Sequence, residues 1–191
     1  MKRLVLLLFC CTLLIVALLA ASRRTPLPEI SLRRAVLSHP AFSSSASGQI
    51  AGRARALDGD SIAVAGVPIR VWGIDAPEWR QRCRGPAGQI YRCGRLAFRA
   101  LAHRLQFASV RCVPHMRDRF GRLVATCYQG EDDIGRWMVR SGLALDWPRY
   151  SGGAYADAEG DARSAERGMW QGAFVRPWDW RHGRAELTSR P

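Results

Sequence analysis

The stretch from residue 58 to residue 78 constrains the fold most strongly, because it alternates short apolar runs with turn signals. Ser61–Val64 is a short β-prone run, and residues 69–74 form a second apolar run. Between them, Gly66-Val67-Pro68 is a turn signal. This part of the chain therefore predicts a strand, a turn and a second strand.

Polar residues stand at defined points of these two predicted strands. Asp60 precedes the first strand, and Arg70 is the polar residue inside the second. The second strand ends at Asp75, and Glu78 follows after an Ala-Pro step. Carboxylates at strand ends with an arginine among them are what a divalent cation and a phosphate need together.

Each of these residues also has a purely structural interpretation. Asp58-Gly59-Asp60 alone favours a hairpin turn. Arg70 can face solvent on an edge strand. Asp75 and Glu78 can cap a helix or form salt bridges. An EF-hand loop that starts at Asp58 is excluded, because its sixth residue is not glycine and its twelfth is not glutamate.

The charge of the chain points to a polyanionic partner. The 191 residues include 29 lysines and arginines against 16 acidic residues, a formal net charge of +13, and Lys2 is the single lysine. Arginine binds phosphate through two parallel hydrogen bonds, which lysine does not. Nucleic acid and an anionic membrane are both candidates. A solvated basic surface is the alternative.

The N-terminal region predicts export. Basic residues flank an apolar run over residues 4–21, so we expect residues 1–22 to be a signal peptide or an uncleaved membrane anchor. Residues 23–49 are predicted to be a flexible linker, residues 50–175 the folded domain and residues 176–191 a tail. The domain is expected outside the cytoplasm (periplasmic, secreted or membrane-anchored), as a monomer that meets a membrane only through an uncleaved N-terminal segment.

Four cysteines of the exported region predict two disulfides. Cys112 and Cys127 lie at equal distances from the middle of a turn at residues 117–122, between predicted strands at 110–113 and 123–128. A regular hairpin would place them opposite each other. That pairing leaves Cys83 with Cys93. A zinc site is the alternative, but no pair has C-x-x-C spacing.

The remaining patterns predict one more strand and three helices. The strand covers residues 53–57, and the helices cover residues 95–106, a segment capped by Asp133, and residues 155–167. Leu96 and Ala165 are assigned to buried helix faces. An aromatic run is assigned to the core or to a seal over it: Trp170, Phe174, Trp178 and Trp180. The fold class is α+β, mainly β, with a five-stranded barrel like the oligonucleotide/oligosaccharide-binding (OB) fold and three packed helices.

Three polar motifs now carry a resemblance. In order, D-G-D-S, R-V-W-G-I-D-A-P-E and D-R-F-G-R lie on the expected elements. Together with helical segments up to residue 170, they resemble the thermonuclease family, the staphylococcal-nuclease-like domains. The resemblance covers residues 53–170, most of the exported body.

The resemblance implies a role for each motif residue: Ca²⁺ ligands at Asp60, Asp75 and the backbone carbonyl of Ala76, a general base at Glu78, and phosphate contacts from Arg70 and Arg122. The implied protein is an exported Ca²⁺-dependent nuclease. It would hydrolyse phosphodiester bonds of DNA and RNA with low sequence specificity and leave 3′-phosphates. Calcium accepts such hard oxygen ligands, and a phosphodiester must be neutralised before hydroxide can attack it.

Two other functions fit the same sequence. The first is a non-catalytic exported OB-fold module that binds nucleic acid, which would not need Glu78. The second is an envelope-anchored structural protein whose basic face meets anionic lipid or a surface polymer.

Overall fold

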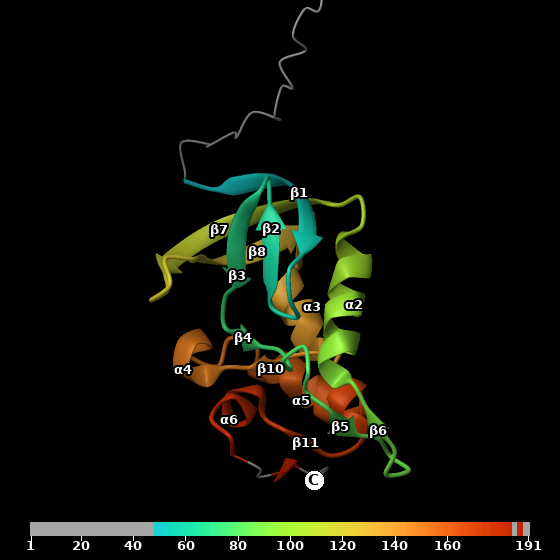
Figure 1. The fold of residues 1–191 in the computed structure, drawn as a ribbon. Helices are drawn as coiled ribbons and strands as arrows, with labels where there is room; N and C mark the ends of the chain where they lie inside the picture. The colour runs from blue at the N-terminus through green and yellow to red at the C-terminus, as the bar shows by residue number, and fades with distance from the viewer. Residues whose placement is uncertain (1–47, 185–186, 189–191) are drawn as a thin grey trace, which may run out of the picture. The chain divides into compact units, whose positions relative to one another are not determined.

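The computed structural model describes residues 48–184 and 187–188, and a small β-barrel lies at one end of this part of the chain (Figure 1). Five strands close the barrel in the order β1-β2-β3-β8-β7, because β3 pairs with β8 as well as with β2. The β3–β8 pairing is parallel and the other four are antiparallel. The barrel strands are β1 (Ile50–Ala56), β2 (Ser61–Val64), β3 (Val67–Val71), β7 (Ser109–Arg117) and β8 (Leu123–Gln129). The predicted α+β class with an OB-fold-like barrel is confirmed.

The interior of the barrel is filled by the alternate apolar residues of its strands. In β3, Ile69 and Val71 are buried, whereas Arg70 between them is only partly buried. This alternation follows from the pleat of a strand, which points successive side chains to opposite faces. The polar position of the predicted second strand therefore lies on the outer wall of the barrel.

The second predicted strand does not run straight through residues 69–74. It breaks at Gly73, whose φ of +73° lies in the left-handed region, and resumes as β4 (Ile74–Asp75). A side chain at Gly73 would also meet Ser151 Cβ at 3.0 Å. Beyond the break, β4 pairs with β10 (Leu145–Asp146), outside the barrel. This change of partner sets the position of Asp75.

Within residues 48–184 and 187–188, the three predicted helices are present together with two further short ones. The predicted helices are α2 (Cys93–Leu105), α3 (Ile134–Arg140) and α5 (Ala156–Ser164). Asp133 caps α3 as expected, because its side chain accepts a hydrogen bond from the Arg136 N–H. The sequence did not predict α4 (Pro148–Ser151) or α6 (Pro177–Arg181). Leu96 and Ala165, assigned to buried helix faces, are exposed: Leu96 lies on the outer side of α2, and Ala165 follows the last residue of α5 as its C-cap.

A second apolar cluster lies under the C-terminal part of the chain, below the barrel in Figure 1. It contains Trp170 and Phe174, with Trp178 packed against it, whereas Trp180 is 39 % exposed. The segment predicted as a tail contributes α6 and a strand, since β11 (Phe174–Val175) pairs with β12 (Leu187–Thr188). Three short elements complete the structure: β5 (Cys83–Arg84), β6 (Ile90–Tyr91) and β9 (Asp132–Asp133), with a 3₁₀ turn at Gly168–Gln171.

Two disulfides link the cysteines in the predicted pairing. Cys112 and Cys127 face each other across the β7–β8 hairpin, with a Cα–Cα distance of 4.0 Å. Cys83 and Cys93 are joined with a Cα–Cα distance of 5.6 Å, between β5 and the start of α2. The second disulfide belongs to the lower apolar cluster, where it closes the loop that contains β5 and β6.

The predicted leader at residues 1–22 and most of the predicted linker lie outside the described residues. Within residues 48–184 and 187–188, no helix combines the length and apolar character that a membrane span requires.

Candidate active site

The centre of the site is an ion-pair cluster built on β2, β3 and β4. Arg70 lies opposite Ser61 in the β2–β3 hairpin, so its side chain stands beside Asp60. Its Nη1 donates to Asp60 Oδ1 at 2.9 Å, and its Nη2 donates to Asp75 Oδ1 at 2.9 Å. The Arg70 guanidinium therefore bridges two carboxylates, Asp60 and Asp75, that are 15 positions apart in the sequence.

This cluster is shielded from solvent, which changes its electrostatics. The Asp75 side chain is fully buried, and that of Arg70 is 18 % exposed. Burial raises the pKa of Asp75 from 3.8 to about 6, even though the neighbouring Arg181 and Arg70 stabilise its charge. The pKa of Arg70 is raised, because Asp60 and Asp75 outweigh the burial that opposes its charge. Breaking such a buried pair typically costs about 3–5 kcal/mol.

Glu78 reaches the same place from the segment after β4. Its side chain is 28 % exposed, and its N–H donates to the fully buried Gln81 at 3.2 Å. The first turn of α2 packs directly on this segment, and a side chain at Gly94 would come within 1.8 Å of the Glu78 carbonyl oxygen. Glycine at the start of α2 thus lets the backbone of Glu78 lie against the helix.

Arg122 is held by the turn between β7 and β8. The Asp118 carboxylate accepts hydrogen bonds from the N–H groups of Phe120 and Arg122, each at 2.9 Å, and from Arg122 Nε at 2.8 Å. Although its slight burial acts in the opposite direction, these bonds to Arg122 and Phe120 lower the pKa of Asp118. The sequence had assigned Asp118 only to a turn. In the structure it orients Arg122.

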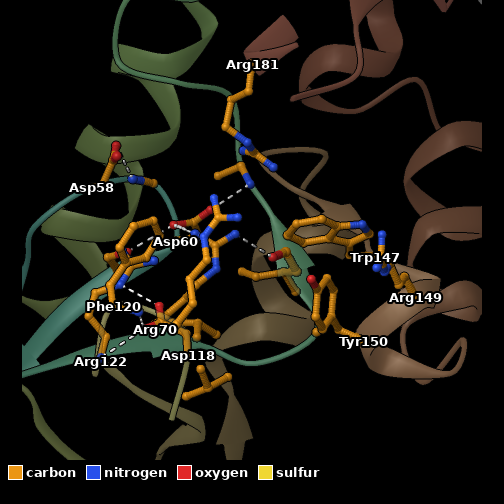
Figure 2. Close-up of a pocket in the computed structure, with 18 of the residues that line it drawn as sticks. Asp58, Asp60, Arg70, Asp118, Phe120, Arg122, Trp147, Arg149, Tyr150 and Arg181 are labelled. Carbon is orange, nitrogen blue, oxygen red and sulfur yellow. Dashed lines mark hydrogen bonds and ion pairs between the residues drawn. The ribbon is translucent and has the colours of Figure 1, made fainter. Parts of the chain in front are cut away.

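Asp60, Arg70 and Arg122 line one cleft of about 660 Å³. Figure 2 shows Asp60 and Arg70 in the middle, with Phe120 and Arg122 on one side and Trp147 and Tyr150 on the other. Glu78 and Ala76 also line the cleft. Asp75 does not appear on its surface, because Arg70 and Arg181 cover its carboxylate. The structure thus brings the six predicted site residues together.

Asp60 and Asp75 are the carboxylates that could ligate a cation. Asp60 Oδ2 accepts a hydrogen bond from the Ala76 N–H at 3.2 Å, so the backbone of Ala76 lies beside this pair. In the described part of the chain, no group of three or more His, Cys, Asp or Glu residues is arranged to hold a metal ion. A cation here would keep several water ligands, as Ca²⁺ does readily.

Arg181, at the end of α6, is a site residue that the sequence did not predict. Its Nη1 and Nη2 donate to the two oxygens of Asp75 at 2.9 and 2.7 Å, and Nη1 also donates to Glu78 Oε1 at 2.7 Å. Although partial burial opposes its charge, these two carboxylates raise the pKa of Arg181. It was missed because its segment carries no polar motif, only an aromatic and basic run.

The Trp147 ring packs against the guanidinium groups of both Arg70 and Arg181 at one side of the cleft. Its ring lies 5.7 Å from the Arg70 guanidinium carbon and 5.3 Å from that of Arg181. The Trp178 ring stacks on it at 6.1 Å, nearly parallel. No local pattern in the sequence pointed to the two arginines that lie around Trp147.

Comparison with known proteins indicates the family of the chain. Residues 68–172 match the family model described as staphylococcal nuclease homologue. The succinoglycan biosynthesis protein ExoI of Rhizobium meliloti (strain 1021) is 39 % identical over 124 residues, which cover 64 % of this chain and 65 % of that protein. A protein named "Probable endonuclease lcl3" of Botryotinia fuckeliana (strain B05.10) is 29 % identical over 136 residues, 65 % of this chain and 50 % of the relative.

A second protein of that name, from Colletotrichum graminicola (strain M1.001 / M2 / FGSC 10212), is 35 % identical over 118 residues, 56 % of this chain and 41 % of the relative. The chain matches less than two thirds of the length of each of these relatives. The family model, in contrast, covers more than half of this chain and includes five of the six predicted site residues. The protein is a member of the staphylococcal nuclease homologue family.

Proposed function

We propose that the protein is an exported, Ca²⁺-dependent nuclease that hydrolyses phosphodiester bonds of DNA and RNA with low sequence specificity. The observation that carries the proposal is the convergence of Asp60, Arg70, Glu78 and Arg122 on one cleft. Family membership and the endonuclease names of several relatives support a nuclease.

The two arginines would bind the phosphate. A guanidinium has five N–H donors in one plane, so Arg70 can keep its bonds to Asp60 and Asp75 and still donate to a phosphate oxygen. Arg122 reaches the cleft from the turn before β8, the strand that pairs with β3, and its Nε is held by Asp118. Positive charge from two guanidinium groups would stabilise the charge that builds on the phosphate oxygens during attack.

Glu78 would act as the general base. It would take a proton from water while the water oxygen forms a bond to phosphorus and the bond from phosphorus to the 5′ oxygen breaks. The products would be a 3′-phosphate and a 5′-hydroxyl, the latter protonated from solvent. A carboxylate that is 28 % exposed in the cleft can accept this proton and release it afterwards.

The residues present fit a calcium ion by their donor chemistry. Asp60 and Asp75 supply two hard carboxylates, and the Ala76 carbonyl can complete a set in which water fills the remaining positions. A bound calcium ion would supply positive charge beside the phosphate and polarise the attacking water. Its ligands must be ionised, and the raised pKa of Asp75 makes that requirement dependent on pH.

Two disulfides support a location outside the reducing cytoplasm. The formal net charge of +13 supports a polyanionic substrate, and arginine contacts to phosphate carry no sequence information. Low sequence specificity follows from that type of contact.

The test is cleavage of plasmid DNA and of a single-stranded RNA by the oxidised chain of residues 1–191, with calcium and with a chelator. We expect cutting that requires calcium and that Glu78→Gln slows by orders of magnitude. Glu131→Gln is the matched control, since Glu131 is exposed between β8 and β9 and does not line the cleft. Binding that weakens with salt but is never followed by cutting would identify a nucleic-acid-binding module instead.

A further inference from the structure

Arg181 occupies the carboxylates that a cation would need. Its guanidinium donates to both oxygens of Asp75, at 2.9 and 2.7 Å, and to Glu78 at 2.7 Å. The first of these residues is the proposed calcium ligand and the second is the proposed general base. One side chain therefore covers the ligand and the base at the same time.

The position of Arg181 is set by the packing of its segment. The buried Gln81 side chain donates to the Val175 carbonyl at 2.6 Å, just before α6. Within α6, Trp178 stacks on Trp147. After α6, β12 returns and pairs with β11. These contacts before, within and after the helix position Arg181 at the cleft that it lines, where Figure 2 shows its side chain pointing toward Asp60 and Arg70.

The guanidinium of Arg181 and a calcium ion would bind the same ionised oxygens of Asp75, so they cannot both occupy them. Because that carboxylate is fully buried, it has no spare solvent-facing oxygen for a second cation. Both oxygens of Asp60 also accept hydrogen bonds, but from Arg70 at Oδ1 and from the Ala76 N–H at Oδ2, whereas the bonds of Arg181 go to Asp75 and Glu78. Cation entry at Asp75 thus requires Arg181 to leave.

We propose that Arg181 is a built-in competitor of the divalent cation: it holds Asp75 and Glu78 while no cation is bound, and the cation displaces it. Displacement would free the ligand and the base in one step, so the enzyme would be off until calcium arrives. The proposal rests on the proposed function and adds a regulatory segment that lies beyond the region matched by the family model, which ends at residue 172.

The experiment measures calcium affinity by calorimetry on the oxidised chain of residues 1–191, without nucleic acid. Arg181→Met removes the charge but keeps an apolar stem beside Trp147. If the ion pair is open about a tenth of the time, its removal lowers the apparent calcium dissociation constant about tenfold. Arg181→Lys keeps the charge but loses the two-point contact, so it should fall between wild type and Arg181→Met.

Arg184→Met is the matched control. Arg184 lies in the same segment, pairs with Asp179 at 3.1 Å, and has a side chain that is 68 % exposed. It does not line the cleft. This variant removes the same formal charge, so a general electrostatic effect would appear in both variants, whereas competition appears only at position 181.

Thermal unfolding supplies a second readout. With a chelator, Arg181→Met should melt at a lower temperature than wild type, because Asp75 and Glu78 lose their partner. Saturating calcium should narrow this difference, since the ion replaces the guanidinium. The difference in melting temperature between wild type and Arg184→Met should be the same with and without calcium.

Equal or weaker calcium binding by Arg181→Met would overturn the proposal while calcium-dependent cutting by wild type still upheld the nuclease. A loss of cleavage rate by Arg181→Met at saturating calcium would also overturn it, because Arg181 would then contact the substrate phosphate. If neither wild type nor any variant binds calcium or cuts nucleic acid, the proposed function is refuted, and so is the proposal that Arg181 competes with the cation.

Discussion

Arg70 and Asp75 are five positions apart, and the break at Gly73 brings Nη2 of the first within 2.9 Å of Oδ1 of the second. Arg70 leaves the barrel wall from β3, whereas Asp75 belongs to β4, which pairs outside the barrel. The site is therefore assembled where the chain leaves the barrel. A change that restores a continuous strand here would move Asp75 away from Arg70.

Replacement of the proposed general base tests the chemistry directly. Glu78→Gln keeps the size of the side chain but cannot accept a proton, so we expect kcat to fall by about 10²–10⁴-fold. Binding of a short DNA duplex should change little, since the arginines remain. The measurement is single-turnover cleavage, with binding followed by fluorescence anisotropy. A rate within twofold of wild type would remove Glu78 from the mechanism.

Calcium affinity should depend on pH through Asp75. Burial raises its pKa from 3.8 to about 6, and only the ionised carboxylate binds a cation. Affinity should therefore be constant above about pH 7 and fall up to tenfold per unit as the pH drops below 6, because one proton competes with the ion. Calorimetric titrations between pH 5 and pH 8 would show this. An unchanged affinity at pH 5 would contradict the raised pKa.

Asp118 should act on catalysis only through Arg122. Asp118→Ala removes the acceptor of the Arg122 Nε hydrogen bond, so Arg122 would sample other positions. We expect kcat/KM to fall about tenfold, which corresponds to about 1.4 kcal/mol of transition-state stabilisation. Asp132→Ala is the control, because Asp132 is an exposed carboxylate whose partner is Arg104, remote from the cleft residues. Equal effects of the two substitutions would show that Asp118 has no positioning role.

Two glycines in helices should respond to alanine in opposite directions. A Cβ at Gly94 would lie 1.8 Å from the Glu78 carbonyl oxygen, so Gly94→Ala must displace α2 or the backbone of Glu78. We expect lower stability together with lower activity. Gly160 lies on the exposed side of α5 with open space around it, so Gly160→Ala should stabilise the protein by about 0.5–1 kcal/mol. Urea unfolding and plasmid cleavage of both variants would check this pair.

Much of the fold follows from local patterns. The strand Ser61–Val64 and the alternation around Arg70 are visible in the sequence, because one face of each strand must be apolar. The disulfide between Cys112 and Cys127 follows from the symmetry of one hairpin about its turn. The helix boundary at Asp133 follows from its capping side chain. Each of these features depends on residues close together in the chain.

The sequence by itself therefore determined the barrel strands and the polar motifs that supply Asp60, Arg70, Asp75, Glu78 and Arg122. Only the tertiary structure decided that β4 leaves the barrel to pair with β10, and that Arg181 closes over Asp75 from 106 positions away. Periodicity and turn signals act over a few residues, whereas these contacts depend on how distant segments pack. No local pattern marks an arginine for a carboxylate that it meets only after the chain has folded.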